Sequence, residues 1–334
     1  MTPPRPTPPT PGGEPAIRTH ELTKKFGDSL AVDHVTMTIP RGSIFGFIGP
    51  SGCGKTTTVR LMLGIYQATA GVVEVLGRSP DHFRSADRQR IGYMPQIFVM
   101  YPDLSVWENL SFAASLYGMP LRRHKRLAEL LDLVELTGHE DKLVRNISGG
   151  MRQRLSLAAA LIHDPDLIFL DEPTAGIDPV LRNKFWDHFR HLQSEGHTLF
   201  VTTQYVGEAA YCDYVGVMSD GRLLMVEKPA ELRRRALGGD VIVVKPDRIL
   251  NFQELSELRG QSFVRDRRAS LNRDLALEVV VEDAATALPA IFAWLERHDL
   301  AVETANEYNP PFDDVFVRLL EQEAARRKAE VSHA

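Results

Sequence analysis

The amino-acid sequence predicts an α/β fold with a largely parallel sheet, followed by a small C-terminal α+β domain. Between residues 17 and 235, short β-rich runs alternate with longer amphipathic segments, a pattern typical of a parallel sheet covered by helices. Within this region, residues 43–49 form an apolar run that leads directly into a glycine-rich turn and a helical pattern. After residue 235 the strand-like and helical segments become shorter and more mixed, which indicates a separate domain.

The chain begins with a proline-rich segment. Proline has no backbone N–H to donate to a helix or a sheet, and the segment lacks the apolar core of a signal peptide. We therefore expect residues 1–16 to be a disordered tail. A ligand for a proline-recognising domain is the alternative interpretation.

The larger domain is predicted to start with antiparallel strands, followed by the buried strand at residues 43–49 and a helix at residues 55–63. A mostly helical stretch at residues 106–136 indicates an inserted helical subdomain, which we place at about residues 97–165. Two further buried strands, separated by a helix, are expected beside the first strand. These are residues 167–171 and 198–204, with the helix at residues 180–194.

The C-terminal α+β domain is predicted to cover residues 236–325, with a tail at residues 326–334. Its strand-like and helical segments alternate along the chain. They are strands at residues 240–246, 277–283 and 301–308, and helices at residues 288–298 and 313–328.

Composition excludes several classes of protein. The formal net charge of −5 gives no basic footprint of the kind that nucleic-acid binders carry, so no nucleic-acid partner is expected. The two cysteines, Cys53 and Cys212, are too few for a disulfide framework and fit a reducing, cytosolic setting. No run approaches the roughly 18 to 20 apolar residues that cross a bilayer. Any membrane role therefore needs a partner chain.

A glycine-rich loop with the sequence GPSGCGKT follows the first buried strand. Its glycines allow a tight turn that points successive backbone N–H groups inward, and the following helix adds the positive end of its dipole. This is a cradle for phosphate oxygens. The residues predicted to hold the nucleotide there are Gly49, Pro50, Ser51, Gly52, Cys53 and Gly54.

Three side chains at the end of this loop complete the predicted phosphate site. Lys55 is expected to reach the β and γ phosphates, and the hydroxyl of Thr56 is expected to bind Mg²⁺. Thr57 is expected to contact the phosphates nearer the sugar.

Two acidic residues end the strand at residues 167–171. A carboxylate such as Asp171 is costly to bury unless a hydrated Mg²⁺ lies nearby. Glu172 is then the candidate that orients or deprotonates the attacking water. A strand-end turn or a helix cap is the alternative explanation for this pair.

A second glycine-assisted helix start lies at Ser148, Gly149 and Gly150. Free N–H groups and the helix dipole at such a position can bind the side of a γ phosphate opposite Lys55. Taken alone, the segment is only a helix N-cap.

These motifs, taken together, are similar to those of the ABC transporter ATPase family over roughly residues 17–227. The loop ending at Lys55 resembles the Walker A motif, and LIFLDEP resembles Walker B. Gln96 in YMPQ resembles the Q-loop glutamine. NISGGMRQRL resembles the ABC signature, and AGID, which ends at Asp178, resembles the D-loop.

The resemblance implies a P-loop ATPase domain with a helical subdomain that closes head to tail as a dimer. The segment at residues 148–150 of one copy would then face the ATP held by Lys55 of the other, either an identical subunit or a close relative. Gln96 would sense Mg²⁺ and couple the site to a membrane partner. Phe26 matches the place of the aromatic residue that stacks on adenine, although a lone phenylalanine is more often a core residue.

Two positions depart from the usual family pattern. Met151 replaces the usual glutamine of the signature, and Gln204 replaces the frequent histidine of the switch. Glutamine can donate a hydrogen bond to a γ phosphate but cannot carry a proton at neutral pH. Both substitutions resemble the drug-exporter branch, whose ATPase is a separate polypeptide.

The C-terminal segment at residues 309–320 resembles the end of ATPases paired with ABC-2 type permeases. The alternative is an amphipathic terminal helix with one buried stripe, formed by Phe312, Val315, Phe316 and Leu319.

The resemblance implies an ATP-binding and ATP-hydrolysing subunit that drives a separate integral-membrane permease, with ATP and Mg²⁺ as cofactors. Export of drugs, lipids or polysaccharide is expected, from the cytoplasmic face of the inner membrane. A groove near Gln96 and residues 101–109 would receive the permease.

Two other function classes are alternatives to a transport ATPase. A soluble non-transport ABC protein acting on ribosomes or nucleic acid commonly has two cassettes or a long coiled coil, and neither is found in this sequence. A regulatory module that barely hydrolyses ATP is opposed by the presence of Lys55, Asp171 and Glu172.

Overall fold

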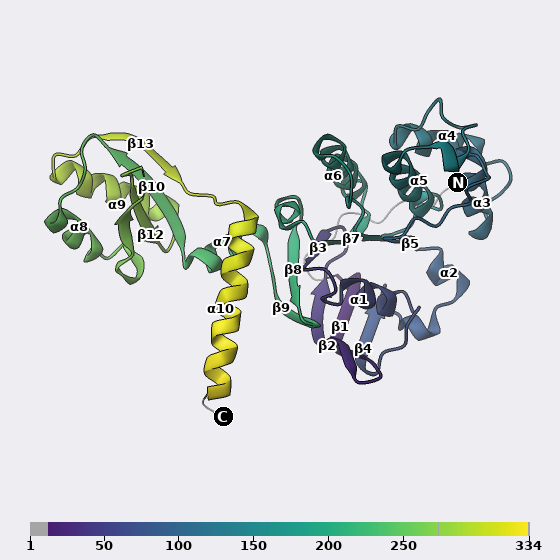
Figure 1. The fold of residues 1–334 in the computed structure, drawn as a ribbon, viewed down its shortest axis with the longest axis horizontal. Coiled ribbons are helices and arrows are strands. Elements are labelled where there is room, and N and C mark those ends of the chain that lie inside the picture. The colour runs from purple at the N-terminus through teal and green to yellow at the C-terminus, as the bar shows by residue number, and fades with distance from the viewer. Residues whose placement is uncertain (1–12, 273, 333–334) are drawn as a thin grey trace. The chain divides into compact units, whose positions relative to one another are not determined.

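The computed structural model describes residues 13–272 and 274–332, and it divides into two compact units, residues 1–227 and 228–334 (Figure 1). Most of the tail predicted at residues 1–16 lies outside the described residues. The domain boundary predicted at residue 235 falls within α7 (Pro229–Leu237), which belongs to the second unit.

The first unit is built around a six-stranded sheet with the order β5-β6-β7-β3-β8-β9. Its neighbouring strands are parallel except for the last pair, β8 and β9. β3 and β6 are buried along their whole length, as expected for parallel strands covered on both faces. The strands are β3 (Ile44–Ile48), β5 (Ile91–Met94), β6 (Leu167–Asp171), β7 (Thr198–Thr203), β8 (Tyr214–Ser219) and β9 (Arg222–Glu227).

The predicted strands of this sheet are present, but their order differs from the prediction in one respect. β7 lies beside β3, whereas β6 pairs with β7 and is separated from β3 by it. The expectation that both strands stand beside the first one is therefore wrong for β6. Strand order depends on how distant segments pair, and periodicity carries no information about that pairing.

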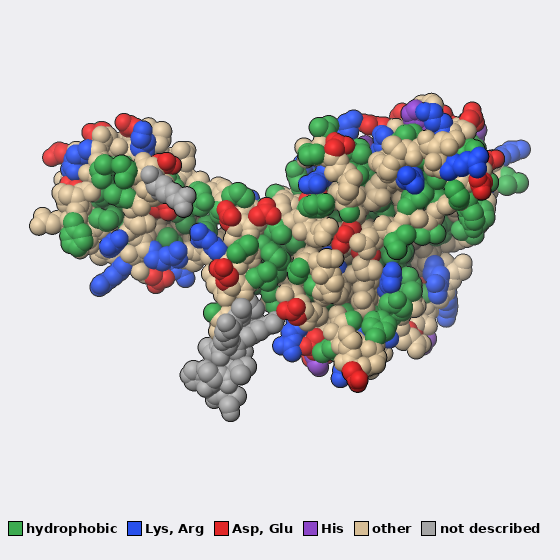
Figure 2. Space-filling model, in the orientation of Figure 1, with side chains coloured by type: hydrophobic (Ala, Val, Ile, Leu, Met, Phe, Trp, Pro, Cys, Tyr) green, Lys and Arg blue, Asp and Glu red, His purple; other side chains and the backbone are tan. Residues whose placement is uncertain are grey.

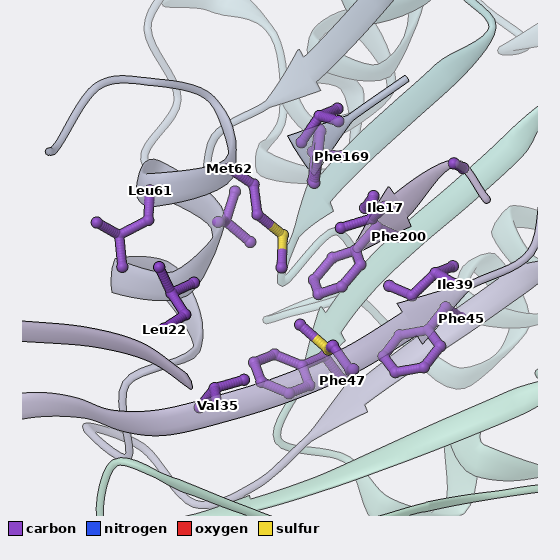
Figure 3. Packing of buried hydrophobic residues seen from close by; sticks show 14 of the residues in the cluster. Ile17, Leu22, Val35, Ile39, Phe45, Phe47, Leu61, Met62, Phe169 and Phe200 are labelled. Atoms are coloured by element: carbon purple, nitrogen blue, oxygen red, sulfur yellow. The ribbon is translucent and has the colours of Figure 1, made fainter. Parts of the chain in front are cut away.

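A second, antiparallel sheet with the order β2-β1-β4 packs with α1 (Lys55–Met62) against one face of the central sheet. Its strands are β1 (Ile17–Phe26), β2 (Ser29–Ile39) and β4 (Ala70–Val75). Figure 3 shows the core between these layers, where Phe45 and Phe47 of β3 lie with Phe200 of β7. The ring centroids of Phe45 and Phe200 are 5.4 Å apart. This aromatic layer fixes β3 and β7 side by side below the glycine-rich loop.

Four helices lie on the side of the first unit away from α1. Figure 1 shows α5 and α6 on the opposite side of the central sheet from α1. The helices are α3 (Val106–Leu116), α4 (His124–Leu133), α5 (Gly149–Leu161) and α6 (Pro179–Ser194). α3 begins at a capping box in which Ser105 and Glu108 each accept the other's backbone N–H. Short helical segments complete the unit: α2 (Ser85–Arg88), η1 (Pro80–His82), η2 (Val144–Asn146) and η3 (Val206–Tyr211).

The second unit contains a βαββαβ segment. Its four-stranded antiparallel sheet has the order β11-β12-β10-β13, the arrangement of a split βαβ motif. The strands are β10 (Asp240–Pro246), β11 (Ala269–Leu271), β12 (Leu277–Val281) and β13 (Val302–Glu307), and the helices are α8 (Phe252–Arg259) and α9 (Ala284–Arg297), with the short η4 (Arg265–Arg267) before β11. The sequence prediction missed α8 and β11.

α7 and α10 (Phe312–Ser332) complete the second unit. The stripe predicted on the terminal helix is present, because Phe312, Val315 and Leu319 are buried and Phe316 is half-buried. The guanidinium of Arg233 on α7 lies 3.9 Å from the centroid of the Phe312 ring. The tail predicted at residues 326–334 lies partly in α10, and its last two residues are outside the described part.

The surface carries charges of both signs. Figure 2 shows Lys and Arg side chains interspersed with Asp and Glu side chains over the face in view. Among the described residues, no helix has the length and apolar character needed to cross a membrane.

Candidate functional site

The glycine-rich loop lies between β3 and α1, at the carboxyl end of β3. Gly52 and Gly54 have φ of +78° and +109°, a region that residues with a Cβ atom rarely adopt. A Cβ atom at Gly49 would lie 2.2 Å from the carbonyl oxygen of Met218, so the backbones approach too closely for a larger residue. These glycines are therefore required by the loop's shape.

The loop and the start of α1 present free backbone donors. Among the described residues, the N–H groups of Gly52, Gly54, Lys55, Thr56 and Thr57 donate no hydrogen bond to the protein. Unsatisfied N–H groups at a helix N-terminus, together with the helix dipole, form a site for an anion. This geometry is compatible with the phosphate cradle predicted from the sequence.

Lys55 lies inside this loop and is 4% exposed. Its Nζ donates hydrogen bonds to the carbonyl oxygens of Gly49 and Pro50, at 2.8 and 3.0 Å. The same Nζ lies 3.8 Å from Oε1 of Glu172. A single ammonium group thus connects the loop with the end of β6.

Cys53 is buried in the same loop, and its Sγ lies 4.0 Å from Nζ of Lys55. Burial raises the pKa of this thiol. The group is therefore a neutral packing element of the loop at physiological pH.

Asp171 ends β6 and is completely buried. Its Oδ1 accepts hydrogen bonds from the hydroxyls of Thr56 and Thr202, at 3.1 and 2.5 Å. Its Oδ2 is buried and has no hydrogen-bond partner within the described part of the chain. An unpartnered carboxylate oxygen beside a threonine hydroxyl is a donor set that Mg²⁺ accepts, so these residues fit the metal predicted from the sequence.

Glu172 follows directly and has a φ of +51°, in the left-handed region that is unfavourable for a residue with a long side chain. Its backbone N–H donates to the carbonyl and the hydroxyl of Thr202, at 3.1 and 3.0 Å. Its Oε2 accepts a hydrogen bond of 3.0 Å from Nε2 of Gln96. Thr202 of the neighbouring strand β7 therefore holds the strained backbone of Glu172, and Gln96 holds its carboxylate.

Thr202 is a site residue that the sequence analysis missed. It pairs with Asp171 in the register of β6 and β7, and its hydroxyl contacts both acidic residues. The only signal in the sequence is a threonine near the end of a buried strand. This threonine can be linked to the acidic residues only when β6 and β7 are known to be neighbours.

Thr174 and Glu208 form a second contact that was not predicted. The hydroxyl of Thr174 donates a hydrogen bond of 2.7 Å to Oε1 of Glu208, and both side chains are buried. Because Glu208 lies in η3, shortly after Gln204, this bond ties the segment after Walker B to the switch segment.

Several predicted residues make no described contact with this cluster. Ser148 caps α5 by accepting the N–H of Met151 at 3.2 Å, and Gly149 opens that helix. Asp178 caps α6 by accepting the N–H of Leu181 at 3.0 Å. Gln204 is exposed just after β7. Ser148, Gly149 and Asp178 are also exposed, so all four are accessible to a ligand or a second copy.

Gly150 is the third glycine-assisted position of the signature. It lies within α5, and a Cβ atom there would come within 3.0 Å of the Leu181 side chain. Close packing against α6 therefore favours glycine at this position.

Phe26 ends β1 and is 44% exposed. Its ring makes an edge contact with Tyr66, with the centroids 5.3 Å apart. Nζ of Lys24 lies 5.0 Å from the same ring. An exposed aromatic ring at this position is compatible with the predicted adenine stacking.

The sequence matches the family described as "ABC transporter" over residues 32–175. It is 39% identical over 245 residues to the Nod factor export ATP-binding protein I of Ralstonia nicotianae, covering 72% of this chain and 76% of that protein. It is 34% identical over 285 residues to the protein of the same name from Cupriavidus pinatubonensis, covering 85% and 86%.

A third relative is longer than this chain. The sequence is 41% identical over 228 residues to the probable multidrug ABC transporter ATP-binding protein YbhF of Escherichia coli, which covers 67% of this chain. The match spans only 39% of YbhF's own length.

Solved structures give the same result for the fold. The structure of cbiO1 from Clostridium perfringens, part of the ABC transporter complex cbiONQ, matches with a TM-score of 0.60 at 28% identity and covers 66% of this chain and 91% of that one. The ATP-binding cassette MJ0796, in a dimeric post-hydrolysis state with ADP and Pi, matches with a TM-score of 0.59 at 26% identity and covers 64% and 98%.

The fold class predicted from the sequence is thus confirmed. The three relatives are named as ATP-binding proteins of a multidrug ABC transporter or of Nod factor export, so the alternative of a non-transport ABC protein is not supported. The chain belongs to the ABC transporter family and is an ATP-hydrolysing, ATP-binding subunit of such a transporter.

Proposed function

We propose that the cluster of Lys55, Thr56, Asp171 and Glu172 is the site at which this subunit binds MgATP and hydrolyses it. The observation that carries the proposal is the pair of acidic residues at the end of β6. Asp171 has a buried carboxylate oxygen with no partner, and Glu172 has a carboxylate 3.8 Å from Nζ of Lys55. The family assignment supports the reaction, and this geometry supports the choice of residues.

The loop residues bind the phosphates. The free N–H groups of Gly52 and of residues 54–57, together with the ammonium of Lys55, attract the triphosphate and orient its γ phosphate toward the end of β6. Thr56 and Asp171 would hold Mg²⁺ and Gln96 would sense it, and the ion would supply positive charge to neutralise charge that develops on the phosphate oxygens. Thr57 contacts the phosphates nearer the sugar, and Phe26 stacks on the adenine.

Glu172 orients the attacking water and accepts its proton. Its carboxylate is held by Nε2 of Gln96 at 3.0 Å, and its backbone is held by Thr202. Gln204 follows β7 immediately and donates a hydrogen bond to the γ phosphate, but its amide carries no proton. The proton therefore leaves through Glu172.

The second half of each site comes from another copy. Ser148, Gly149 and Asp178 are exposed and make no described contact with the glycine-rich loop. In a head-to-tail dimer, the α5 N-termini of two copies provide the missing donors on the far side of each γ phosphate. Gly150 contributes to this second half through the same segment. The partner subunit is a second copy or a close relative.

A separate membrane permease receives the motion. Apolar side chains gather after Gln96, where Ile97 and Val99 are each 73% exposed and Tyr101 is 54% exposed. Such a patch next to Gln96 suits an apolar cytoplasmic helix of a permease. We place the subunit at the cytoplasmic face of the inner membrane through this contact.

The direction of transport is proposed to be export. The relatives are named for multidrug transport and for Nod factor export, and the C-terminal segment resembles that of ATPases paired with ABC-2 type permeases. Drugs, lipids and polysaccharides are therefore the cargo classes to test. Purification from native membranes, followed by identification of the integral-membrane subunit, tests this part; recovery with ribosomes instead would contradict it.

The catalytic assignment is tested with Glu172→Gln. This variant keeps a hydrogen-bond acceptor but cannot take a proton, so steady-state ATP turnover should fall by about 100-fold or more, with ATP affinity within a few-fold of wild type. Glu129→Gln, an exposed change on α4, serves as the control and should leave turnover unchanged. Unchanged turnover in Glu172→Gln would contradict the assignment.

A further inference from the structure

The second unit contains a cavity of about 830 Å³ that none of the nucleotide chemistry uses. Side chains alternate across a strand, so Ile242 and Val279 point to the core beneath α8 and α9, while Val241 and Val280 point the other way and line the cavity. The cavity therefore lies along the sheet face not covered by that core, near the edge strand β11. Its volume is within the range of small-molecule sites.

Four arginines line this cavity. Arg259 ends α8, Arg267 and Arg268 precede β11, and Arg318 lies on α10. The acidic lining consists of Glu278, so the four arginines leave a net charge of +3 at the wall. Among the described residues, none of the four arginines forms an ion pair. In that part of the chain they lack a carboxylate partner, even though the chain as a whole has more acidic than basic side chains.

The protein itself fixes two of these guanidinium groups. Arg259 donates from Nε to the carbonyl oxygen of Ala269 at 2.8 Å. Arg268 donates from one terminal nitrogen to the carbonyl oxygen of Leu237 at 2.6 Å. Each group keeps further N–H donors, and a guanidinium already held in place loses less conformational entropy when it binds an anion.

Arg267 reaches the cavity through a strained turn. Asp266 and Arg267 both have left-handed backbones, with φ of +51° and +57°. Two consecutive non-glycine residues in this region cost folding free energy, and such strain persists where the surrounding structure imposes it.

The remaining wall is apolar and aromatic. Leu237, Val241 and Val280 form a small buried cluster at the cavity. Tyr308 also lines it and is 39% exposed, with its backbone N–H bonded to the carbonyl oxygen of Val241 at 2.7 Å. The wall thus combines guanidinium donors with an apolar surface and one accessible aromatic ring.

We propose that this cavity is a binding site for a small organic anion that carries a phosphate-type group on an apolar or aromatic body. Guanidinium groups pair with the oxygens of such a group in bidentate geometry, and the apolar wall and Tyr308 receive the rest of the ligand. The site is independent of the nucleotide site, because every lining residue belongs to the second unit.

The test uses the full chain and 1-naphthyl phosphate as the probe, titrated by calorimetry. MgADP is present at saturation, so that the probe cannot occupy the phosphate cradle at Lys55. We expect one further binding site per chain. Neutral 1-naphthol and inorganic phosphate should each bind at least about tenfold more weakly than the probe, because 1-naphthol lacks the phosphate group and inorganic phosphate lacks the aromatic body.

Arg267→Gln combined with Arg318→Gln removes two cavity arginines that donate no described hydrogen bond to the protein, so the fold should tolerate the change. The pair Arg265→Gln and Arg297→Gln removes the same charge from exposed positions outside the cavity. We expect probe affinity to fall at least about tenfold in the first double variant and to change less than twofold in the second.

Three results would overturn the proposal. These are no binding of the probe at millimolar concentration, equal binding in wild type and the cavity variant, and equal weakening in both double variants. A further experiment measures binding of the chain to vesicles that contain phosphatidylglycerol. Binding to vesicles without binding to the soluble probe would show a membrane surface contact and would also overturn the small-molecule site.

Discussion

At the scale of single residues, the sequence predicts the polar side chains at the end of β6, but it does not predict the backbone conformation and the neighbouring hydroxyl that hold them in place. The hydroxyl of Thr56 contacts Asp171, and the ammonium of Lys55 lies near Glu172, in the arrangement that the motifs indicated. The left-handed backbone of Glu172 and the hydroxyl of Thr202 were not foreseen, because both depend on a neighbouring strand about thirty positions away. Phe26, Ser148, Asp178 and Gln204 keep their predicted roles as proposals.

Thr202→Val tests the support of the acidic pair. Valine keeps the shape but removes the hydroxyl that donates to Asp171 and accepts from Glu172, so ATP turnover should fall roughly tenfold. Thr198→Val, at the other end of β7, removes a hydroxyl that accepts from the N–H of Gly42. Both variants should lose about 1 kcal/mol of unfolding free energy, whereas only Thr202→Val should lose turnover. Equal turnover in the two variants would contradict the role of Thr202.

Gly54→Ala tests the shape of the glycine-rich loop. Its added Cβ atom would lie 2.4 Å from the carbonyl oxygen of Ala31, and φ there is +109°. We expect roughly 2 kcal/mol or more of destabilisation in thermal unfolding, together with weaker ATP binding. Gly207→Ala, where no atom lies within 4 Å of the added Cβ, should stay within about 0.5 kcal/mol of wild type. A stable Gly54→Ala variant that binds ATP normally would show that this glycine is dispensable.

At the scale of elements, continuous apolar runs and long periodic segments were predictable, whereas short segments of mixed polarity were not. The buried strands β3, β6 and β7 and the helix α6 appear at the predicted places. α8 has eight residues and β11 has three, which is too short for a periodic pattern to stand out from a loop. The order of strands also escaped prediction, since it is set by contacts between distant segments.

The start of α8 is predicted to lose stability in acid. Hydrogen bonds from the guanidinium of Arg248 and then from the N–H of Asn251 lower the pKa of Glu254 to about 2. Because the folded pKa lies below the ordinary value of 4.5, the stabilisation is fully present above that value and is lost as pH falls from about 4.5 toward 2. Solvent screening limits its size to about 1 kcal/mol.

Hydrogen exchange of the α8 amides in the full chain measures this effect. Glu254→Gln should reduce protection relative to wild type at pH 6. The difference should narrow by about pH 3, because Glu254 in the unfolded segment, with its ordinary pKa of 4.5, then binds a proton that the folded carboxylate does not. Glu296→Gln, an exposed change on α9, should show no such pH-dependent difference. A constant gap between Glu254→Gln and wild type across this range would contradict the assignment.

At the scale of the whole molecule, the chain combines an ATPase unit with a second unit of different architecture. ATP-binding subunits of this family dimerise and work with membrane permeases, and the exposed signature segment at Ser148 fits that arrangement. The sequence indicated two domains through a change of pattern after residue 235, but it gave no sign of the arginine-lined cavity. That cavity depends on bringing α8, α10 and the sheet together, which local patterns do not encode.

Mixing two inactive variants tests the shared site. Lys55→Ala removes the phosphate-binding ammonium, and Ser148→Arg blocks the signature segment, so each homodimer should hydrolyse ATP poorly. A mixed dimer places both defects in one site and leaves the other site intact. A 1:1 mixture should therefore recover up to about a quarter of wild-type turnover if the two sites act independently.

The control for this experiment is a mixture of Lys55→Ala with Glu172→Gln, both of which belong to the same half of each site. Their mixed dimer has no intact site, and turnover should stay at the level of the separate variants. Equal recovery in both mixtures, or no recovery in either, would contradict a site shared between copies.

The position of β7 between β3 and β6 has a genetic consequence. The separation of the two phosphate-site motifs is set by the register of a buried strand whose interior residues, such as Phe200 and Val201, lie completely inside the core. A screen for loss of transport should therefore recover substitutions along β7 as well as in the motifs. Some of these variants should be present in normal amounts but hydrolyse ATP slowly. A small shift of β7 is enough to separate the glycine-rich loop from the acidic pair, and such a shift does not require the chain to unfold.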